Sequence, residues 1–279
     1  MDVSVIIPFY KGHKYLSNLE RMLEANYRNI NEYSMEVLFV NDYPEDRLVL
    51  DTSIYKYEVH VINNITNVGI HRSRLIGLEN SKGEFILFLD QDDEIDDTLI
   101  VNQLQKIKKS GADIMITNGL YMNPDGSKHL IYKNNKHLNC CKDINCYICF
   151  TNPIVSPGQA LIRRDAIPDE WKGHFFSENG ADDFYLWLLM FYYKREYEIN
   201  PQVLYTHVYT GENTSFQSEK MKKSINEMIE NLEGKYSRYQ LWKIKRRNIY
   251  SASYKKGILH KLLYLDVCLS RKIYCVLHF

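Results

Sequence analysis

Short, almost wholly apolar runs alternate with amphipathic stretches over the first third of the chain. Four runs have the length of strands and are rich in Val, Ile, Leu and Phe, which is typical of strands buried on both faces. They cover residues 3–7, 35–42, 57–64 and 84–90. Between them, 12–26 and 67–83 carry apolar side chains at helical spacing. This alternation predicts a mostly parallel sheet with helices on both faces, as in Rossmann-like α/β proteins.

The pattern becomes more varied after residue 93. Helical spacing of apolar residues predicts a helix over 97–112, and a β-branched run predicts a strand over 113–123. Segment 156–167 fits either a strand or a loop that crosses the functional face of the sheet, and 182–194 predicts an apolar, aromatic helix. Segment 132–150 mixes short polar and apolar runs and favours no single element.

The composition is that of an ordinary globular protein, with 45% hydrophobic and 25% charged residues in a chain of 279. This length allows one large domain with an extension. We expect an α/β domain over 1–218, made of a first half over 1–93 and a second half over 94–218. A helical extension over 219–279 would follow it.

The extension differs from the rest of the chain in charge. The formal net charge of the chain is zero, yet residues 220–279 contain 14 Lys and Arg against 4 Asp and Glu. A basic excess at one end indicates an anionic partner. Cations, aromatic residues and leucines over 235–279 fit a helical arm that lies on an anionic membrane surface. They fit equally well a helical subdomain that packs on the core or forms a homodimer.

Six cysteines do not make a disulfide framework in a chain of this length. The N-terminal sequence lacks the basic and apolar regions of a signal peptide, and no run of about 18 uncharged apolar residues predicts a membrane span. We therefore expect a cytoplasmic protein with reduced thiols, which the extension could place on the inner face of the cell membrane. The spacing of Cys140, Cys146 and Cys149 leaves a zinc site open, although no matched second pair accompanies it.

Polar and aromatic side chains follow three of the predicted strands, at the edge where open parallel sheets bind ligands. The residues at these strand ends are Pro8, Phe9 and Tyr10, then Asp42, and then Asp90, Gln91, Asp92 and Asp93. Such a set suits a nucleotide, because rings can stack on the base, carboxylates can bind base or ribose, and a metal can neutralise the phosphates. Carboxylates this close raise one another's pKa unless a cation lies among them, so we expect a metal.

Two common nucleotide sites are excluded by their missing glycines. No G-x-G-x-x-G follows the first strand, and no G-x-x-x-x-G-K-[ST] occurs. Without a glycine cradle a divalent ion must neutralise a diphosphate, and carboxylate oxygens suit Mg²⁺ or Mn²⁺. A nucleic-acid partner is not expected, because this edge of the sheet already forms a coherent site for a smaller ligand.

Four segments occur in the order and spacing of a known family: VSVIIPFYKG, LFVNDYPED, NVGIHRSRLIGLENSKGEFILFLDQDD and GADDFYLWLLM. Over residues 2–215 the chain thereby resembles the family 2 glycosyltransferases of bacterial surface polysaccharide synthesis, which have the GT-A fold. The resemblance implies a metal-dependent hexosyltransferase that moves a sugar, with inversion, from a nucleotide-diphosphate sugar that is commonly UDP-linked. It also implies a glycan or a lipid-linked saccharide as the acceptor.

The same resemblance implies a donor site and a metal site. The implied donor contacts are Pro8, Phe9, Tyr10, Asp42, Asn67, Arg74, Asp90 and Gln91. The D-x-D pair, Asp90 and Asp92, would reach the ribose and the metal, and His207 is the candidate for a further metal ligand. Other readings stay open, because His207 also fits an ordinary loop histidine and the aromatic pair after the first strand also fits the core. Arg72 does not share a helix face with Arg74 and fits a surface charge.

An acidic pair at the start of a later helix carries the catalytic base in this family. Aligned here, the pair is Asp182 and Asp183, with Asp in place of the usual Glu at the first position. Asp183 would take the proton of the attacking acceptor hydroxyl. Carboxylates at a helix start also cap free N–H groups, which is the alternative interpretation. Trp171 could line the acceptor site, whereas Trp187, inside an apolar helix, favours core packing.

Two other functions stay compatible with the pattern. A sugar nucleotidyltransferase would use a similar nucleotide site, but it needs a glycine-rich loop after the first strand, and PFYKGHKYL is not one. A non-catalytic module for binding a nucleotide sugar or a glycan would keep the fold and would bind the donor without turnover.

Overall fold

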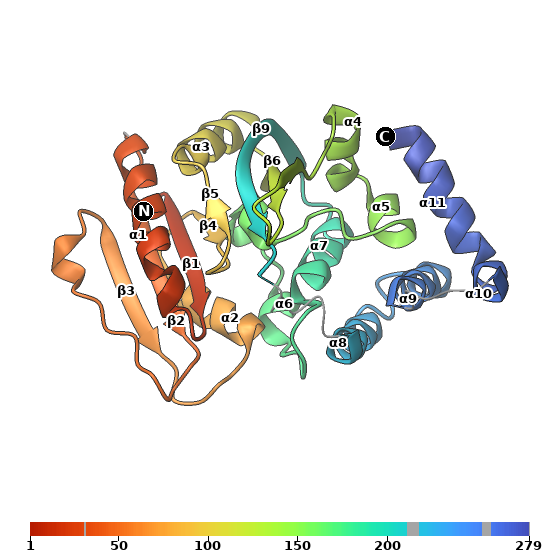
Figure 1. The fold of residues 1–279 in the computed structure, drawn as a ribbon, viewed down its shortest axis with the longest axis horizontal. Helices are drawn as coiled ribbons and strands as arrows, with labels where there is room; N and C mark the ends of the chain where they lie inside the picture. Colours follow the sequence, from red (N-terminus) through yellow and green to blue (C-terminus); the bar gives the residue numbers. More distant parts are fainter. Residues whose placement is uncertain (31, 211–217, 253–257, 279) are drawn as a thin grey trace.

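The structure is a computed structural model that describes residues 1–30, 32–210, 218–252 and 258–278. Within these residues one mixed sheet has the strand order β3-β2-β1-β4-β8-β6-β9-β5, with β7 paired to β6 (Figure 1). The strands are β1 Val3–Phe9, β2 Met35–Asn41, β3 Glu58–Asn63, β4 Phe85–Phe88, β5 Glu94–Ile95, β6 Ile114–Met122, β7 Lys128–Leu130, β8 Ala160–Arg163 and β9 Tyr197–Val208.

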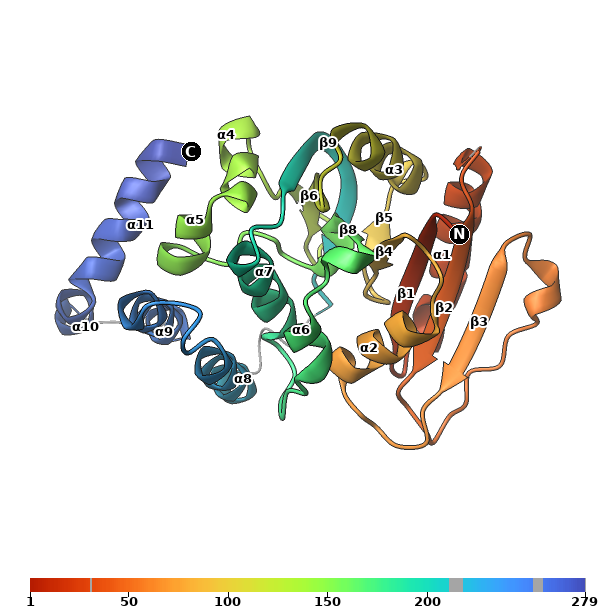
Figure 2. The same ribbon diagram turned by 180° about the vertical axis from the view of Figure 1, so that it is seen from behind.

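Helices cover both faces of this sheet, with α1 and α3 over one face and α2, α6 and α7 over the other (Figures 1 and 2). The helices are α1 His13–Asn29, α2 Ile70–Asn80, α3 Leu99–Ser110, α4 Asn135–Leu138, α5 Ile144–Cys149, α6 Asp169–Gly173, α7 Asp182–Tyr192, α8 Ser218–Asn231, α9 Arg238–Ala252, α10 Ile258–Leu263 and α11 Leu265–His278. The predicted α/β class with a helical extension is confirmed.

The first half of the sheet follows the sequence pattern closely. Strand β1 pairs in parallel with both β2 and β4, and β2 pairs in parallel with β3. Strands β1, β2 and β4 are fully buried, as their mostly apolar sequences predicted. Their carboxyl ends therefore meet at one edge of the sheet, where Asp42 and Asp90 follow β2 and β4.

The second half departs from a simple parallel sheet. Strand β8 lies between β4 and β6 and is antiparallel to both, so segment 156–167 does contain a strand. Strand β9 pairs in parallel with β6 through an irregular register, and the sequence pattern did not predict it. Segment 132–150 contains the short helices α4 and α5.

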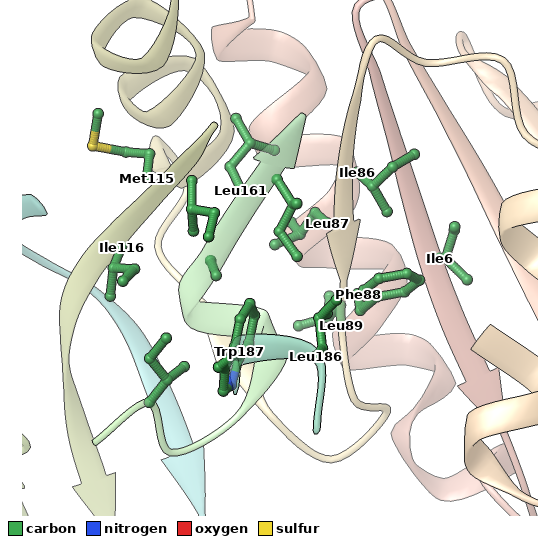
Figure 3. Close-up of a cluster of buried hydrophobic side chains, with 14 of the residues drawn as sticks. Ile6, Ile86, Leu87, Phe88, Leu89, Met115, Ile116, Leu161, Leu186 and Trp187 are labelled. Atoms are coloured by element: carbon green, nitrogen blue, oxygen red, sulfur yellow. The ribbon is translucent and has the colours of Figure 1, made fainter. Parts of the chain in front are cut away.

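Both tryptophans discussed above are core residues. Trp187 on α7 lies with Leu186 against the strands of the sheet (Figure 3), which confirms its predicted packing role. Trp171 on α6 is only 1% exposed, and its indole N–H donates to the backbone oxygen of Asp182 at 2.8 Å. The expectation that Trp171 could line an acceptor site is therefore wrong, because helix α6 buries the ring between α2 and α7.

The basic extension forms helices α8–α11 at the end of the molecule opposite to β3 (Figures 1 and 2). Helix α9 contacts α5 and α8, and α11 contacts α5 and α9. On α11, Val267 and Tyr274 are buried, and the Tyr274 hydroxyl donates to the Asp143 carboxylate at 2.8 Å. Among the described residues, no helix is long and apolar enough to cross a bilayer.

Candidate active site

A cleft of about 970 Å³ opens at the carboxyl ends of β1, β2 and β4 and at the start of α7. The first-half strands supply one wall, which we call the sheet wall, and α8 with α9 supply the opposite one, which we call the helical wall. The donor-binding, metal-binding and catalytic residues that the resemblance implied all line this cleft: Pro8, Phe9, Tyr10, Asp42, Asn67, Arg74, Asp90, Gln91, Asp92, Asp182, Asp183 and His207. Segment 211–217, which follows His207 and completes the sequence stretch in which it was noticed, lies outside the described residues.

Asp93 is the centre of a buried hydrogen-bond network on the sheet wall. Its carboxylate accepts from the Tyr205 hydroxyl, from Ser156 Oγ at 3.2 Å and from the backbone N–H of Val208 at 3.1 Å. It also lies 3.0 Å from His207 Nδ1. Asp93 is therefore a positioning residue, which joins the turn after β4 to the end of β9.

His207 is oriented by this network. The contact to Asp93 occupies Nδ1, so Nε2 is the ring nitrogen left for a ligand, as in histidines that a carboxylate holds for a metal. Burial opposes protonation of the imidazole, but the hydrogen bond and charge of Asp93 outweigh it and raise the pKa of His207. Neighbouring Asp90 and Asp92 add to this rise.

Asp92 differs from its neighbours because its carboxylate has no side-chain partner among the described residues. Burial raises its pKa to about 7, and the charges of Asp93 and Asp90 contribute to the rise. An unpaired carboxylate under such repulsion favours a cation beside it. Asp92 and the Nε2 atom of His207 thus have the chemistry to hold a divalent metal.

Three or more His, Cys, Asp or Glu side chains can share a metal ion if they lie close enough together. One such group occurs among the described residues: Glu36, Glu58 and His60. It lies on β2 and β3, away from the cleft, and Lys82 already pairs with Glu58 there. All six cysteines are free thiols and do not form such a group, so the open zinc reading gains no support.

Arg74 joins the two acidic parts of the cleft. Its guanidinium donates to Asp90 at 2.5 Å and to Asp182 at 2.5 Å, and its side chain is almost fully buried. Asp90 also accepts from Ser156 Oγ at 3.2 Å. Arg74 therefore ties the end of β4 to the first turn of α7, and both of its ion pairs are to protein carboxylates. Arg72 instead lies over the ring of Phe175 at 4.3 Å.

Asp183 begins α7 at the boundary between the two walls. Its Oδ2 accepts from Asn152 Nδ2 at 3.1 Å, and its Oδ1 accepts from the backbone N–H of Phe184 at 2.7 Å. Burial and the charge of Asp182 raise its pKa to about 7, although Arg74 opposes the rise. A carboxylate with a pKa near neutrality is suited to accept a proton at physiological pH.

The residues expected at the nucleotide have distinct surroundings. Tyr10 is 43% exposed, whereas the Phe9 side chain is buried against Phe39 and His13. The Gln91 amide donates to Tyr10 O and accepts from Tyr10 N, both at 2.9 Å, which locks the ends of β1 and β4 together.

Asp42 shapes the loop before α2. It accepts from the backbone N–H groups of Val68 and Gly69 at 2.8 Å each, while Asn67, in the same loop, is exposed. Their contacts to a donor stay predictions.

Several residues of the site were not recognised from the sequence as parts of it. Tyr205 and Ser156 hold Asp93, and Asn152 holds Asp183. Asp93 was seen only as one member of an acidic run. These partners are 31 to 112 positions apart in the chain, so only the folded sheet brings them together.

Comparisons with known proteins identify the family of this chain. Residues 4–171 match the family described as Glycosyl transferase family 2. Glycosyltransferase GlyG of Streptococcus pneumoniae serotype 4 is 29% identical over 47% of this chain and 42% of its own length. Poly(ribitol-phosphate) beta-N-acetylglucosaminyltransferase TarS of Staphylococcus aureus is 27% identical over 48% of this chain and 23% of its own length. The matches thus span less than half the length of these relatives.

Solved structures show the same fold. The crystal structure of S. aureus TarS 1–349 superposes on 98% of this chain and 81% of its own with a TM-score of 0.65 at 18% identity. The same fragment solved with UDP-GlcNAc gives a TM-score of 0.64, covering 100% of this chain and 82% of its own. The fold is therefore the expected GT-A fold. Because the family match covers more than half of the chain, this protein belongs to glycosyl transferase family 2.

Proposed function

We propose that this protein is an inverting glycosyltransferase that moves a sugar from a UDP-sugar to a hydroxyl of a glycan or lipid-linked saccharide. The observation that carries this proposal is the pairing, within one cleft, of a base with a pKa near 7, Asp183, and an unpaired carboxylate, Asp92. The UDP preference is supported by TarS, a protein of the same fold that has been solved with UDP and with UDP-GlcNAc.

The donor nucleotide would lie along the sheet wall. Exposed Tyr10 offers a ring for the base, and the side chains of Asn67 and Asp42 lie at the same edge. Gln91 contributes by fixing the backbone of Tyr10 rather than by a free amide. Arg74 and Asp90 are proposed to shape the ribose end of this site, since their charged groups are paired with each other.

Asp183 is proposed to be the catalytic base. It takes the proton from the acceptor hydroxyl as that oxygen attacks the anomeric carbon from the face opposite the diphosphate, which inverts the configuration. Asn152 and the N–H of Phe184 each hold one carboxylate oxygen, so they fix the direction in which the base points. Asp182 is held by Arg74 and therefore positions the start of α7.

Mn²⁺ or Mg²⁺ would be held by Asp92 and His207. Asp90, which belongs to the same acidic run, would add its negative charge to this metal site. When bound, such an ion stabilises the negative charge that develops on the leaving diphosphate. Asp93 keeps Nδ1 of His207 engaged and leaves Nε2 directed to the ligand.

The extension would bring the enzyme to its acceptor. On α11, Val267 and Tyr274 pack inward. Helices α10 and α11 also expose a set of apolar side chains, which we call the outer face of the extension: Leu262, Leu263, Leu265, Leu269, Ile273 and Val276. Together with the basic charge of the extension, this face suits peripheral contact with an anionic membrane. A homodimer through the same face is the alternative, and surface polysaccharide synthesis is the proposed setting.

The proposal is tested by nucleotide release from UDP-, GDP- and dTDP-sugars, with Mn²⁺, with Mg²⁺ and with chelator. We expect slow hydrolysis of one UDP-sugar that needs the metal and falls by about 100-fold in Asp92→Ala. Asp125→Ala, which alters an exposed turn, is the matched control. UDP binding with no turnover, even with saccharide acceptors present, would favour the binding module. In a separate assay, formation of a UDP-sugar and diphosphate from a sugar 1-phosphate and UTP would favour the nucleotidyltransferase.

A further inference from the structure

The helical wall brings basic residues to the cleft from outside the sheet. Helix α8 lines it with Lys220, and α9 lines it with Arg247, Asn248 and Ser251. None of these side chains belongs to the acidic network around Asp93. If the donor lies along the strand ends of the sheet wall, the acceptor would enter on the opposite side of the cleft, next to these residues.

Arg247 is a buried cation, and it differs in its partners from the other arginine beside it on α9. Only 3% of it is exposed, and it donates one hydrogen bond, from Nη1 to the backbone oxygen of Tyr147. Its guanidinium lies 5.0 Å from the ring centroid of Phe184, the residue that follows the proposed base. Among the described residues no Asp or Glu pairs with it, in contrast to neighbouring Arg246, which binds Asp266 bidentately.

A second arginine increases the local positive charge. Arg271 donates from Nη2 to Ser251 Oγ at 2.6 Å, and its buried Nε has no hydrogen-bond partner within the part of the chain that the structure describes. Burial, with a smaller contribution from the charge of Arg271, lowers the pKa of Arg247 to about 10. A buried charge left without its counter-charge is strongly destabilising. We therefore expect a bound anion to neutralise the charge of Arg247.

We propose that Arg247, supported by Arg271, binds an oxyanion carried by the acceptor, either a phosphate or a carboxylate. The proposal rests on the glycosyl transfer proposed above and adds the chemical class of the acceptor. Guanidinium groups bind both oxyanions through paired N–H donors. Because Arg247 lies against Phe184, the anionic group would be held next to Asp183, and the acceptor hydroxyl would be presented to the base.

The experiment uses the full chain saturated with UDP and Mn²⁺, so that the donor site is filled. Glycerol 3-phosphate, glucuronate and uncharged glycerol are titrated separately by calorimetry. We expect at least one of the two anions to bind and glycerol not to bind, and the arm that binds identifies phosphate or carboxylate. Arg247→Met should weaken binding of that anion by about tenfold or more, because charge-assisted hydrogen bonds are lost.

Controls separate this proposal from the donor chemistry. Lys245→Met removes an exposed cation from the same helix and should leave anion binding unchanged. Arg247→Lys keeps the positive charge but loses the paired N–H donors of the guanidinium, so it should bind the anion with intermediate affinity. This variant also tests the proposal if Arg247→Met does not fold. Equal anion binding by Arg247→Met and wild type, or no anion binding by wild type, overturns the proposal.

The remaining outcome concerns the donor. If Arg247→Met weakens UDP binding as much as anion binding, Arg247 serves the donor diphosphate and the acceptor proposal is wrong. If wild type neither binds UDP nor hydrolyses any donor, the proposed function fails, and that result is read before any anion is added.

Discussion

On the sheet wall of the cleft Asp42 and Asp90 have protein partners, and so do Asp93 behind this wall and Asp182 at the start of α7. On the helical wall, in contrast, the buried Arg247 has no carboxylate partner among the described residues. Asp92 is the matching exception on the sheet wall. The comparison separates charged groups that stabilise the fold through protein partners from charged groups that are left for a ligand. A bound cation would neutralise Asp92, and a bound anion would neutralise Arg247.

The largest expected effect concerns the group between the two walls. Asp183→Asn should lower the rate of sugar transfer by about 1,000-fold, since it removes the proton acceptor. Donor affinity should stay unchanged, and both quantities can be measured with radiolabelled UDP-sugar and a saccharide acceptor. Asp169→Asn, at an exposed position of α6, is the control. Transfer within tenfold of wild type would show that another group is the base.

The same residue sets the expected pH dependence. The pKa of Asp183 is raised to about 7, so the carboxylate is increasingly protonated as the pH falls below that value. kcat for transfer should therefore drop about tenfold per pH unit below 7 and level off above it. A profile that is flat between pH 5 and pH 8, measured with saturating metal, would contradict the assignment.

Replacement of a buried arginine by methionine should change the stability of the protein differently on the two walls. Arg74→Met leaves the buried Asp182 and the partly exposed Asp90 without their cation, and we expect it to lower the free energy of unfolding by about 3–5 kcal/mol. Arg247→Met removes a buried charge that lacks a counter-charge, so it should leave the free energy of unfolding unchanged or raise it. Urea denaturation without ligands compares the two. Equal destabilisation would mean that Arg247 is a scaffold residue.

Asp93 tests whether the sheet wall positions its metal ligand. Asp93→Asn should lower the pKa of His207 towards its ordinary value, because the hydrogen bond and charge that raise it are weakened. Mn²⁺ affinity of the UDP complex should fall by about 10- to 100-fold. Proton NMR of the histidine ring and calorimetry measure these effects. Asp51→Asn, on an exposed turn, should change neither.

The smallest expected effect concerns the outer face of the extension. Replacing Leu269 and Ile273 by Ser should reduce co-sedimentation with anionic vesicles by about tenfold, because two exposed apolar side chains no longer enter the interface. Val49→Ser, an exposed apolar change at the opposite end of the molecule, is the control. If vesicle binding is unaffected but a dimer dissociates, this face is a subunit contact.

The two halves of the sheet also differ in how well the sequence predicted them. Strands β1, β2 and β4 are mostly apolar, as expected for strands that helices cover on both faces, and such runs are recognisable without neighbours. Strand β9 contains Pro201 and alternates polar and apolar residues through an irregular register. Its identity depends on pairing with β6, which no local pattern contains.

The site divides in the same way. The acids after β2 and β4 could be assigned because the chain direction in a parallel sheet brings strand ends together. Tyr205 and Asn152 carry no local signal, since each acts only through an acid that is distant in sequence. Arg247 was visible only as part of a basic excess, and its burial beside Phe184 was needed to distinguish it from the exposed cations around it.

The helical wall is built from one continuous piece of chain that follows the last strand of the sheet. All donor-side residues named above precede that piece, so a hybrid protein joined after β9 would exchange the acceptor wall in a single step. Such a hybrid is expected to keep the nucleotide-sugar preference of this chain and to take the acceptor preference of its new helices. The GT-A sheet would then keep the same donor site in every hybrid. Enzymes that act on different acceptors could diverge by replacing their last helices.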